Sequence, residues 1–424
     1  MKKYDEYKDS GVAWIGEVPK HWEVIKLKYK YHFQTGATPN TGKKENFEGE
    51  LKWANISDLN GSVVYDTTKH INKEAASKCS MNISPKGSLM YSFKLSVGTV
   101  AFCGEDMYTN EAIASFIPQK NDLKYLFYCA PIFIIHNANR NIYNAPLLNQ
   151  ELIKNALICL PSLNEQTAIA TYLDTHCAKI DNLISIQQKR IALLQELKQS
   201  VITHAVTKGL NPNVEMKQSG VEWIGDVPKH WEVTKLKFKY HFQTGATPNT
   251  GKKENFEGEL KWANISDLNG SVVYDTTKHI NKKAASKCSM NISPKGSLMY
   301  SFKLSVGSVA FCGEDMYTNE AIASFIPQKN DLKYLFYCAP IFIIHNANRN
   351  IYNAPLLNQE LIKNALICLP SLTEQAAIAS YLDRKCATID TSISNAQHQI
   401  DLLQEYKQSL ITEVVTGKRK VTDN

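Results

Sequence analysis

A tandem duplication is the feature that most constrains this chain of 424 residues. Shifting the sequence by 209 positions aligns residues 10–16 (Ser-Gly-Val-Ala-Trp-Ile-Gly) with residues 219–225 (Ser-Gly-Val-Glu-Trp-Ile-Gly), and the register continues without a gap to the C-terminal end. Solenoid repeats have periods of about 20 to 50 residues. The repeat is therefore a whole domain plus a connector used twice, which agrees with the two to four domains expected for this length.

The two copies have diverged unevenly. Residues 164–209 and 373–418 differ at 19 of 46 positions. Residues 27–163 and 236–372 differ at three of 137 positions, namely Tyr29/Phe238, Glu74/Lys283 and Thr99/Ser308. A recent duplication explains the near identity of residues 27–163 and 236–372. It does not explain why the two connectors, residues 164–209 and 373–418, have diverged. We therefore expect the two connectors to have different roles.

Composition excludes several classes of protein. Hydrophobic residues make up 43% and charged residues 21%, which is untypical of a disordered chain, a collagen-like repeat or a coiled-coil rod. The net charge of +7 permits a polyanionic partner without requiring one. The charged amino terminus shows no secretory signal, and the longest apolar run, residues 125–135, is about half the roughly 20 residues that span a bilayer. We expect a cytoplasmic protein with no membrane contact.

The ten cysteines are widely spaced, lie mostly among apolar residues and form no C-x-x-C pair. We expect reduced cysteines in the core rather than disulfides or a metal site, with metal or redox duty as the less favoured alternative.

The sequence pattern predicts a mixed α/β domain in each copy. Basic residues alternate with apolar ones over residues 26–31, as in a strand with one basic face. Apolar runs at 88–93, 97–103 and 156–160 favour further strands, and residues 122–130 and 132–139 favour helices. The predicted order is a globular domain at 1–163, a long connector helix at 164–209, a second globular domain at 210–372, a second long helix at 373–418 and a tail at 419–424.

Both connectors carry heptad patterns of apolar residues. The seam positions are Leu173, Cys177, Ile180, Ile184, Ile191 and Leu194 in the first copy and Leu382, Cys386, Ile389, Ile393, Ile400 and Leu403 in the second. Gln187 and Ala396 occupy equivalent seam positions and could help to fix the register. The alternative is that each helix lies on its own globular domain, but about 40 residues at roughly 1.5 Å each would overrun such a domain.

Two such seams in one chain most simply pack on each other as an antiparallel coiled coil. The two domains would then be related by an approximate two-fold axis and held apart by the helices. Inverted repeats in duplex DNA have the same symmetry. The connectors differ mainly off the seam, which suits helices that must pair within one chain.

No recognised catalytic motif is present. The loop at residues 36–44 (Gly-Ala-Thr-Pro-Asn-Thr-Gly-Lys-Lys) resembles a phosphate loop, but five residues rather than four separate its glycines and Lys44 stands where Ser or Thr would hold magnesium. There is no dinucleotide-binding glycine pattern, no adenine-methylation tetrad and no H-E-x-x-H. Neither catalytic nor metal-ligating residues are predicted.

The domains do offer side chains suited to nucleic acid, with basic groups for phosphates and hydrogen-bonding groups for base edges. Each taken alone could equally be an ordinary turn or surface residue. The candidate DNA-binding residues are Thr38, Lys43, Lys44, Asn55, Ser57, Asp58, Lys94, Asn110, Arg140 and Asn144 in the first copy and Thr247, Lys252, Lys253, Asn264, Ser266, Asp267, Lys303, Asn319, Arg349 and Asn353 in the second.

Several segments together resemble the specificity subunit of type I restriction-modification enzymes. They are residues 19–24 (Pro-Lys-His-Trp-Glu-Val), 53–59 (Trp-Ala-Asn-Ile-Ser-Asp-Leu), 85–88 (Pro-Lys-Gly-Ser), 160–174 (Leu-Pro-Ser-Leu-Asn-Glu-Gln-Thr-Ala-Ile-Ala-Thr-Tyr-Leu-Asp) and 193–209, and the second copy repeats them. The most specific is the stretch from residue 160. The resemblance covers nearly the whole chain.

The resemblance implies two target-recognition domains that each read one half of a bipartite site in double-stranded DNA, with the helices as ruler and docking platform. It also implies two methyltransferase subunits and restriction subunits as partners. AdoMet, ATP and Mg²⁺ are then used by those partners, and this chain binds no cofactor and is not an enzyme.

One departure from the family pattern concerns the two domains, which generally differ within a family member and are nearly identical here. We therefore expect an interrupted palindromic target. The main alternative is a stand-alone DNA-modifying or DNA-cleaving enzyme with an unrecognised active site, and turnover by the purified chain alone would favour it. A scaffold that binds protein is the third possibility.

Overall fold

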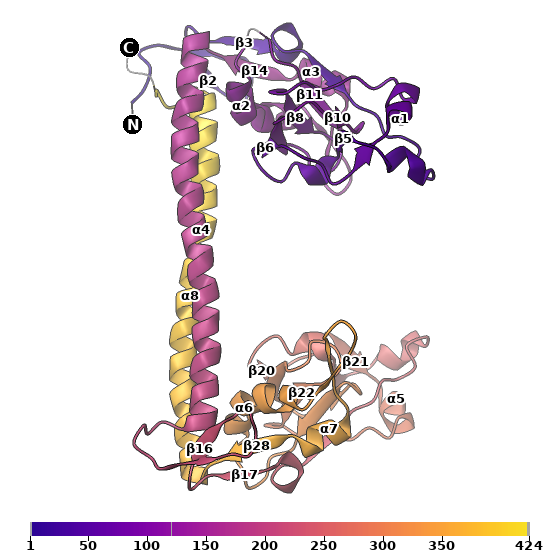
Figure 1. The fold of residues 1–424 in the computed structure, drawn as a ribbon, viewed down its shortest axis with the longest axis vertical. Coiled ribbons are helices and arrows are strands. Elements are labelled where there is room, and N and C mark those ends of the chain that lie inside the picture. Colours follow the sequence, from indigo (N-terminus) through magenta and orange to yellow (C-terminus); the bar gives the residue numbers. More distant parts are fainter. Residues whose placement is uncertain (1, 120, 422–424) are drawn as a thin grey trace. The chain divides into compact units, whose positions relative to one another are not determined.

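The computed structural model describes residues 2–119 and 121–421. The chain divides into two compact units. Unit 1 comprises the residues up to Gln187 together with those from His398 onward, and unit 2 comprises Gln188–Gln397. Each unit holds one mixed α/β domain, which we call head 1 (residues 2–162) or head 2 (residues 210–371), and one segment of each of two long helices (Figure 1).

Head 1 contains fourteen short strands and three helices among its described residues. The strands are β1 (Tyr7–Asp9), β2 (Glu17–Pro19), β3 (Glu23–Lys26), β4 (Phe33–Thr35), β5 (Leu51–Ala54), β6 (Val63–Val64), β7 (His70–Ile71), β8 (Leu89–Ser92), β9 (Val100–Cys103), β10 (Tyr108–Thr109), β11 (Ile113–Phe116), β12 (Asn139–Arg140), β13 (Pro146–Leu147) and β14 (Leu157–Leu160). The helices are α1 (Lys73–Lys78), α2 (Leu123–His136) and α3 (Gln150–Asn155), with 3-10 turns η1 (Leu27–Tyr29), η2 (Lys44–Phe47) and η3 (Ile56–Asp58).

Two sheets form the body of head 1. The larger has the order β4-β11-β8-β9-β6, in which β11 pairs antiparallel with both β4 and β8. The smaller has the order β10-β5-β7, in which β10 runs parallel to β5. Strands β8 and β11 are buried along their full length. This burial explains why they appear in the sequence as short continuous apolar runs.

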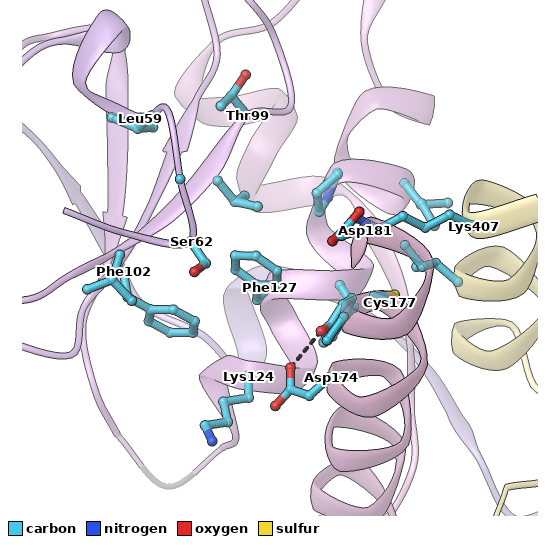
Figure 2. A pocket seen from close by; sticks show the side chains of 18 of the residues that line it. Leu59, Ser62, Thr99, Phe102, Lys124, Phe127, Asp174, Cys177, Asp181 and Lys407 are labelled. Carbon is cyan, nitrogen blue, oxygen red and sulfur yellow. Dashed lines mark hydrogen bonds and ion pairs between the residues drawn. The ribbon is translucent and has the colours of Figure 1, made fainter. Parts of the chain in front are cut away.

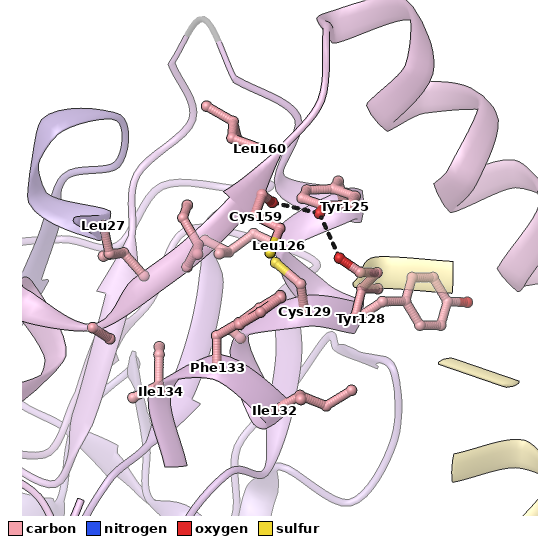
Figure 3. Packing of buried hydrophobic residues seen from close by; sticks show 14 of the residues in the cluster. Leu27, Tyr125, Leu126, Tyr128, Cys129, Ile132, Phe133, Ile134, Cys159 and Leu160 are labelled. Carbon is pink, nitrogen blue, oxygen red and sulfur yellow. Dashed lines mark hydrogen bonds between the residues drawn. The ribbon is translucent and has the colours of Figure 1, made fainter. Parts of the chain in front are cut away.

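Helix α2 fills the core beside the larger sheet. Its N-cap is Asp122, whose carboxylate accepts a hydrogen bond from the backbone N–H of Lys124 at 2.7 Å. The buried Tyr125 hydroxyl donates to the carbonyl of Cys159 in β14 at 2.6 Å and lies 3.4 Å from the carbonyl of Val415, which belongs to the same unit (Figure 3). One side chain thus connects the head, its closing strand and a long helix.

Two predicted elements of head 1 differ from the structure. Residues 122–130 and 132–139 were predicted as separate helices but form the single helix α2, in which Pro131 is accommodated. Residues 26–31 were predicted as a strand, but β3 ends at Lys26 and a 3-10 turn follows. Of the apolar members of that alternation, Leu27 and Tyr31 are buried and lie four residues apart, whereas Tyr29 between them is exposed. Buried side chains four residues apart therefore fit a tight turn as well as a strand.

Head 2 repeats this arrangement within unit 2. Its strands are β15 (Met216–Gln218), β16 (Asp226–Pro228), β17 (Glu232–Lys235), β18 (Phe242–Thr244), β19 (Leu260–Ala263), β20 (Val272–Val273), β21 (Lys278–Ile280), β22 (Leu298–Ser301), β23 (Val309–Cys312), β24 (Tyr317–Thr318), β25 (Ile322–Phe325), β26 (Asn348–Arg349), β27 (Pro355–Leu356) and β28 (Leu366–Leu369). Its helices are α5 (Lys282–Lys287), α6 (Leu332–His345) and α7 (Gln359–Asn364), with turns η4 (Leu236–Phe238), η5 (Lys253–Phe256) and η6 (Ile265–Asp267). The sheet orders are equivalent to those of head 1.

The long helices are α4 (Leu163–Lys208) and α8 (Leu372–Val415), and each contributes to both units. In unit 1 the Asp181 carboxylate pairs with the Lys407 ammonium at 2.7 Å, while Tyr172, nine residues earlier on α4, contacts Arg419 beyond the end of α8. In unit 2 Lys198 pairs with Asp390 at 2.7 Å. Residues further along α4 contact residues that come earlier in the α8 region. The paired segments in unit 1 therefore run antiparallel.

The helix segments also belong to the cores of the heads. In unit 1 Leu173, Cys177 and Ile180 of α4 and Val414 of α8 are buried in the same apolar cluster as the core of head 1. In unit 2 the equivalent cluster of head 2 includes Leu382. The sequence left two arrangements open, in which the seam packs on the other long helix or on its own globular domain. The structure combines them, because the first part of each long helix packs both on its own head and on the other helix.

All ten cysteines are free thiols, and eight of them are buried. The two that are partly exposed are Cys79 and Cys288, at the ends of α1 and α5. Burial raises the pKa of the Cys103 thiol to about 12. The Cys103 thiol is therefore protonated and contributes to packing.

Candidate nucleic-acid interface

Three loops of head 1 lie at the same end of the strands of the larger sheet. The register pairs Ala114 of β11 with Thr35 of β4 and Ile113 of β11 with Ser92 of β8. The end of β4, the end of β8 and the start of β11 therefore lie side by side. The loops at this end carry the predicted DNA-binding residues Thr38, Lys94 and Asn110.

The smaller sheet brings a fourth loop to the same place. Strands β5 and β10 are parallel and end in register at Ala54 and Thr109. The backbone N–H of Asn110 donates to the Ala54 carbonyl at 2.9 Å, so Asn55 lies next to Asn110. We call the exposed surface formed by Thr38, Asn55, Lys94, Asn110 and the adjoining Glu111 the loop face; Thr247, Asn264, Lys303, Asn319 and Glu320 form its equivalent in head 2.

The loop after β4 is held firmly against the end of β10. A Cβ atom at Gly36 would lie 1.6 Å from the Thr109 carbonyl oxygen, so only glycine permits this approach. The Ala37 N–H donates to the same carbonyl at 3.0 Å, and the indole N–H of Trp53 donates to the Ala37 carbonyl at 3.0 Å. Thr38 therefore follows a rigid segment.

Glu111 is the central charge of the loop face, and the sequence patterns did not single it out. The Thr38 hydroxyl donates to its carboxylate, and the Lys94 ammonium lies 3.6 Å from its other oxygen. The hydrogen bond from Thr38, more than the proximity of Lys94, lowers the pKa of Glu111, so the carboxylate is ionised at neutral pH. In the sequence, Glu111 could have been found as the direct neighbour of the candidate DNA-binding residue Asn110.

The equivalent carboxylate of head 2 has the same surroundings. The Thr247 hydroxyl donates to Glu320. Partial burial acts to raise the pKa of Glu320, but the hydrogen bond from Thr247, the backbone N–H and the charge of Lys303 together lower it.

Asn55 and Asp58 form a capping box around η3. The Asn55 side chain accepts a hydrogen bond from the Ser57 N–H, and its amide donates to the Thr68 hydroxyl at 3.3 Å. Asp58 is 5% exposed, and its two carboxylate oxygens accept from the N–H groups of Asn55 and Thr68 at 2.9 and 3.0 Å. Asp58 therefore holds the loop, whereas the amide of Asn55 and the exposed Ser57 are closer to solvent. Asn264, Ser266 and Asp267 repeat this geometry.

Lys43 and Lys44 are exposed at the start of η2, a few residues beyond the loop face. The turn before them is shaped by Asn40, whose side chain accepts from the Gly42 N–H at 2.9 Å. Lys252 and Lys253 are exposed at the equivalent place in head 2. Exposed ammonium groups on a loop of fixed shape are suited to phosphate oxygens.

Arg140 and Asn144 lie apart from the loop face, on the hairpin of β12 and β13. The Arg140 guanidinium donates to the Asn144 carbonyl at 3.0 Å, and Asn144 adopts a positive φ of 62°. Between them Ile142 and Tyr143 project with 91% and 83% of their surface exposed. Arg349 and Asn353 form the same hairpin in head 2.

The seam residues differ in burial. Those that are buried are Leu173, Cys177, Ile180, Leu382, Cys386, Ile389 and Ile400, together with Ala396. Those that are partly exposed are Ile184, Ile191, Leu194, Ile393 and Leu403. The side-chain oxygen of Gln187 is buried without a hydrogen-bond partner.

A groove of about 750 Å³ separates head 1 from the helix segments of unit 1 (Figure 2). Phe102 and Phe127 of the head face Asp181 of α4 and Lys407 of α8 across it. Seven lining residues lie on the long helices: Asp174, Cys177, Ala178, Asp181, Lys407, Gln408 and Ile411. Each is identical to its equivalent in the other copy (Asp383, Cys386, Ala387, Asp390, Lys198, Gln199 and Ile202), although the connectors differ at 19 of 46 positions.

Within residues 2–119 and 121–421, no three His, Cys, Asp or Glu side chains are grouped so that they could hold a metal ion. None of the helices in that part of the chain is both long and apolar enough to span a membrane.

The fold has counterparts among solved structures. The chain superposes with a TM-score of 0.72 on a chain from a study of complex assembly and conformational transition of the type I R-M system, with 15% identity, covering 94% of this chain and 98% of that one. A crystal structure of the HsdS subunit from Thermoanaerobacter tengcongensis gives a TM-score of 0.51 at 16% identity, covering 95% and 98%. The fold, with two mixed α/β heads and two long helices, is therefore shared with these solved structures.

The sequence comparisons identify the family. The model of the type I restriction modification DNA specificity domain matches residues 19–196 and again residues 228–400. The MjaIX specificity subunit of Methanocaldococcus jannaschii is 23% identical over 96% of both chains, and the EcoBI specificity subunit of Escherichia coli is 21% identical over 79% of this chain and 75% of its own length. The chain belongs to the specificity-subunit family of type I restriction-modification enzymes, whose members recognise DNA and are not themselves catalytic.

Proposed function

We propose that this subunit reads an interrupted palindrome, in which one short sequence occurs in inverted orientation on both sides of a spacer. The observation that carries the proposal is the near identity of residues 27–163 and 236–372, which make up most of the two heads and differ at three of 137 positions. All the loop-face residues are the same in both heads. Two heads with the same contact groups recognise the same bases, and two copies of one short sequence in inverted orientation are the palindromic target that such a pair of readers matches.

The two kinds of contact have separate roles in this proposal. Lys43 and Lys44, with their equivalents in head 2, neutralise phosphates and supply affinity. Thr38, Asn55, Lys94 and Asn110 of the loop face supply sequence choice through base edges. Arg140 and Asn144 present a second contact on the β12–β13 hairpin. We do not assign Asp58 a contact with DNA, because its side chain is buried and both of its carboxylate oxygens already accept backbone N–H groups.

Mapping N6-methyladenine across the genome of a host that carries only this system tests the palindrome. We expect one motif whose two halves are reverse complements around a fixed spacer. Two unrelated half-sites would overturn the proposal.

Charge reversal separates affinity from sequence choice. Lys43→Glu and Lys44→Glu, combined with Lys252→Glu and Lys253→Glu, should weaken binding to all DNA sequences and reduce its salt dependence, while the preferred motif stays the same. The natural difference Glu74/Lys283 should act in the same way and change affinity more than sequence choice. Loss of DNA affinity on these reversals would speak against a scaffold that binds protein, whereas unchanged DNA binding would show that these lysines do not supply the affinity.

We further propose that two methyltransferase subunits dock on the long helices, one in each groove between a head and its helix segments, and that restriction subunits join them. AdoMet, ATP and Mg²⁺ are then bound by those partners, and the assembly acts on DNA in the cytoplasm. The support is the identity of the seven helix residues that line the groove, in connectors that have otherwise diverged.

A bulky residue in the groove tests the docking site. Ala178 is exposed on the groove side of α4, so Ala178→Arg together with Ala387→Arg should leave the subunit folded but abolish its co-purification with the methyltransferase. The matched control is Thr175→Arg, because α8 carries Arg384 at that position. Normal assembly of the double variant would contradict the groove as the docking site.

A further inference from the structure

Glu111 is an anionic group on a surface that otherwise offers amides, hydroxyls and ammonium groups to DNA. Its side chain is 49% exposed. A carboxylate on such a surface repels phosphates and so weakens binding to every sequence. A hydrogen bond that the carboxylate accepts from a base would offset this cost.

The Glu111 carboxylate is held in a fixed orientation by three separate segments of head 1. Thr38 donates to one oxygen from the loop after β4, and Lys94 lies 3.6 Å from the other oxygen in the loop after β8. The turn before β11 is fixed by Asn110, whose side chain accepts from the Ala112 N–H at 3.0 Å. An ionised carboxylate has about four acceptor positions, so both oxygens can accept further hydrogen bonds.

The major groove offers two donors to such a group, the N4 amino group of cytosine and the N6 amino group of adenine. The adenine amino group stands beside the N7 acceptor, which pairs with an amide and repels a carboxylate. Cytosine itself has no acceptor beside its amino group on that edge, because the neighbouring O6 acceptor belongs to the paired guanine. A carboxylate therefore selects cytosine, whereas Gln at the same place would select adenine.

We propose that Glu111 in head 1 and Glu320 in head 2 are specificity-determining residues, each accepting a hydrogen bond from the N4 amino group of a cytosine in its half-site. Thr38 and Thr247, proposed above to contact bases, also orient these carboxylates through the hydrogen bonds that their hydroxyl groups donate. The inference rests on the DNA-reading function proposed above.

Head 2, which keeps Glu320, is the internal reference for a test of the role of Glu111. The variant Glu111→Gln is assembled with the methyltransferase, and its preferred sites are determined by binding selection from a randomised DNA library. The preference for cytosine at one position of one half-site should fall about 5- to 150-fold in favour of adenine, which is the range for one good base contact. The half-site read by head 2 should remain unchanged, so the palindrome becomes asymmetric.

Two controls separate base reading from general charge effects. Glu105→Gln removes a carboxylate that pairs with Lys52, but this residue follows β9 at the opposite end of the strands, where Phe102 pairs with Leu89. It should leave both half-sites unchanged. Thr38→Ala should relax the same cytosine position as Glu111→Gln, and Thr38→Ser should restore it, because serine keeps the hydroxyl.

The outcomes distinguish this inference from the function on which it rests. If Glu111→Gln tightens binding to all sequences equally and leaves the preferred half-sites symmetric, Glu111 does not read a base and the inference is wrong, although the DNA-reading function stands. If the wild-type assembly selects no sequence at all, the proposed function fails and the inference fails with it.

Discussion

Asp58 shows how one buried side chain can shape a loop of the candidate interface. Its two oxygens each accept a backbone N–H, one from the start of η3 and one from Thr68, ten residues away. Replacing Asp58 by Ala leaves both part-buried backbone donors without this partner. We expect Asp58→Ala to lower the stability of unit 1 by about 2 to 4 kcal/mol, measured as the shift of its calorimetric transition.

Asp267 provides the matched control for this change. Asp267→Ala should cause a loss of the same size in unit 2, and Asp58→Asn, which keeps one acceptor oxygen, should cause a smaller one. If Asp58→Ala unfolds at the same temperature as the wild type, the carboxylate is not needed to hold the loop.

The thiols give a second prediction for single residues. Eight of the ten cysteines are buried, and burial raises the pKa of Cys103, Cys159 and Cys177, so their reactive thiolate is scarce at neutral pH. A thiol reagent at pH 8 should modify two groups per native chain, Cys79 and Cys288, and ten after denaturation. Mass spectrometry counts them. Rapid labelling of more than two would show that the heads open more readily than their packing implies.

These residues also show the limits of sequence patterns. The residue type alone does not separate a polar side chain that faces solvent from one that caps a turn. The sequence therefore made base reading equally plausible for Asn55, Ser57 and Asp58. Glu111 was overlooked because its role depends on Thr38 and Lys94, which are 73 and 17 positions away along the chain. Only the pairing of β4, β11 and β8 brings the three together.

At the scale of elements, periodicity predicted most where an element repeats over many residues. The long helices follow a heptad pattern over six turns or more, and both are present. The alternation at residues 26–31 covers only three pairs, and there a strand and a tight turn with residues four apart were not distinguishable. In α2 the proline suggested a break, but Pro131 is accommodated within a helix whose N-cap and buried face outweigh the lost hydrogen bond.

The first part of each long helix should be its most stabilising segment, since it packs on a head and on the other helix at once. Leu173 and Leu382 are fully buried there. Replacing either by Ala removes buried methyl groups and leaves a cavity, so each variant should lose about 2 to 5 kcal/mol of stability in its own unit. Thermal unfolding followed by calorimetry measures the loss.

Leu193 is the matched control on α4, because 65% of its surface is exposed. Leu193→Ala should change stability by no more than about 0.5 kcal/mol. Equal losses for Leu173→Ala and Leu193→Ala would contradict the idea that the head and the helix share one core.

At the scale of the whole molecule, the duplication means that each unit is assembled from both copies. The ion pairs Asp181–Lys407 in unit 1 and Lys198–Asp390 in unit 2 are the same contact, since Lys407 and Asp390 are the equivalents of Lys198 and Asp181. A fragment of residues 1–209 therefore contains both partners of this contact. It should self-associate through Asp181 of one copy and Lys198 of the other, and the dimer should support methylation with the methyltransferase.

Charge reversal makes this last prediction specific to the observed pairing. In a fragment with Asp181→Lys, or in one with Lys198→Asp, both ion pairs of the dimer become repulsive. Each exposed pair contributes about 0.2 to 1 kcal/mol, so each variant alone should associate roughly tenfold more weakly by analytical ultracentrifugation. Mixing the two variants restores both pairs, and a heterodimer of wild-type affinity should form. A wild-type fragment that stays monomeric, or variants that associate equally well alone and mixed, would show that the helices pair in another way.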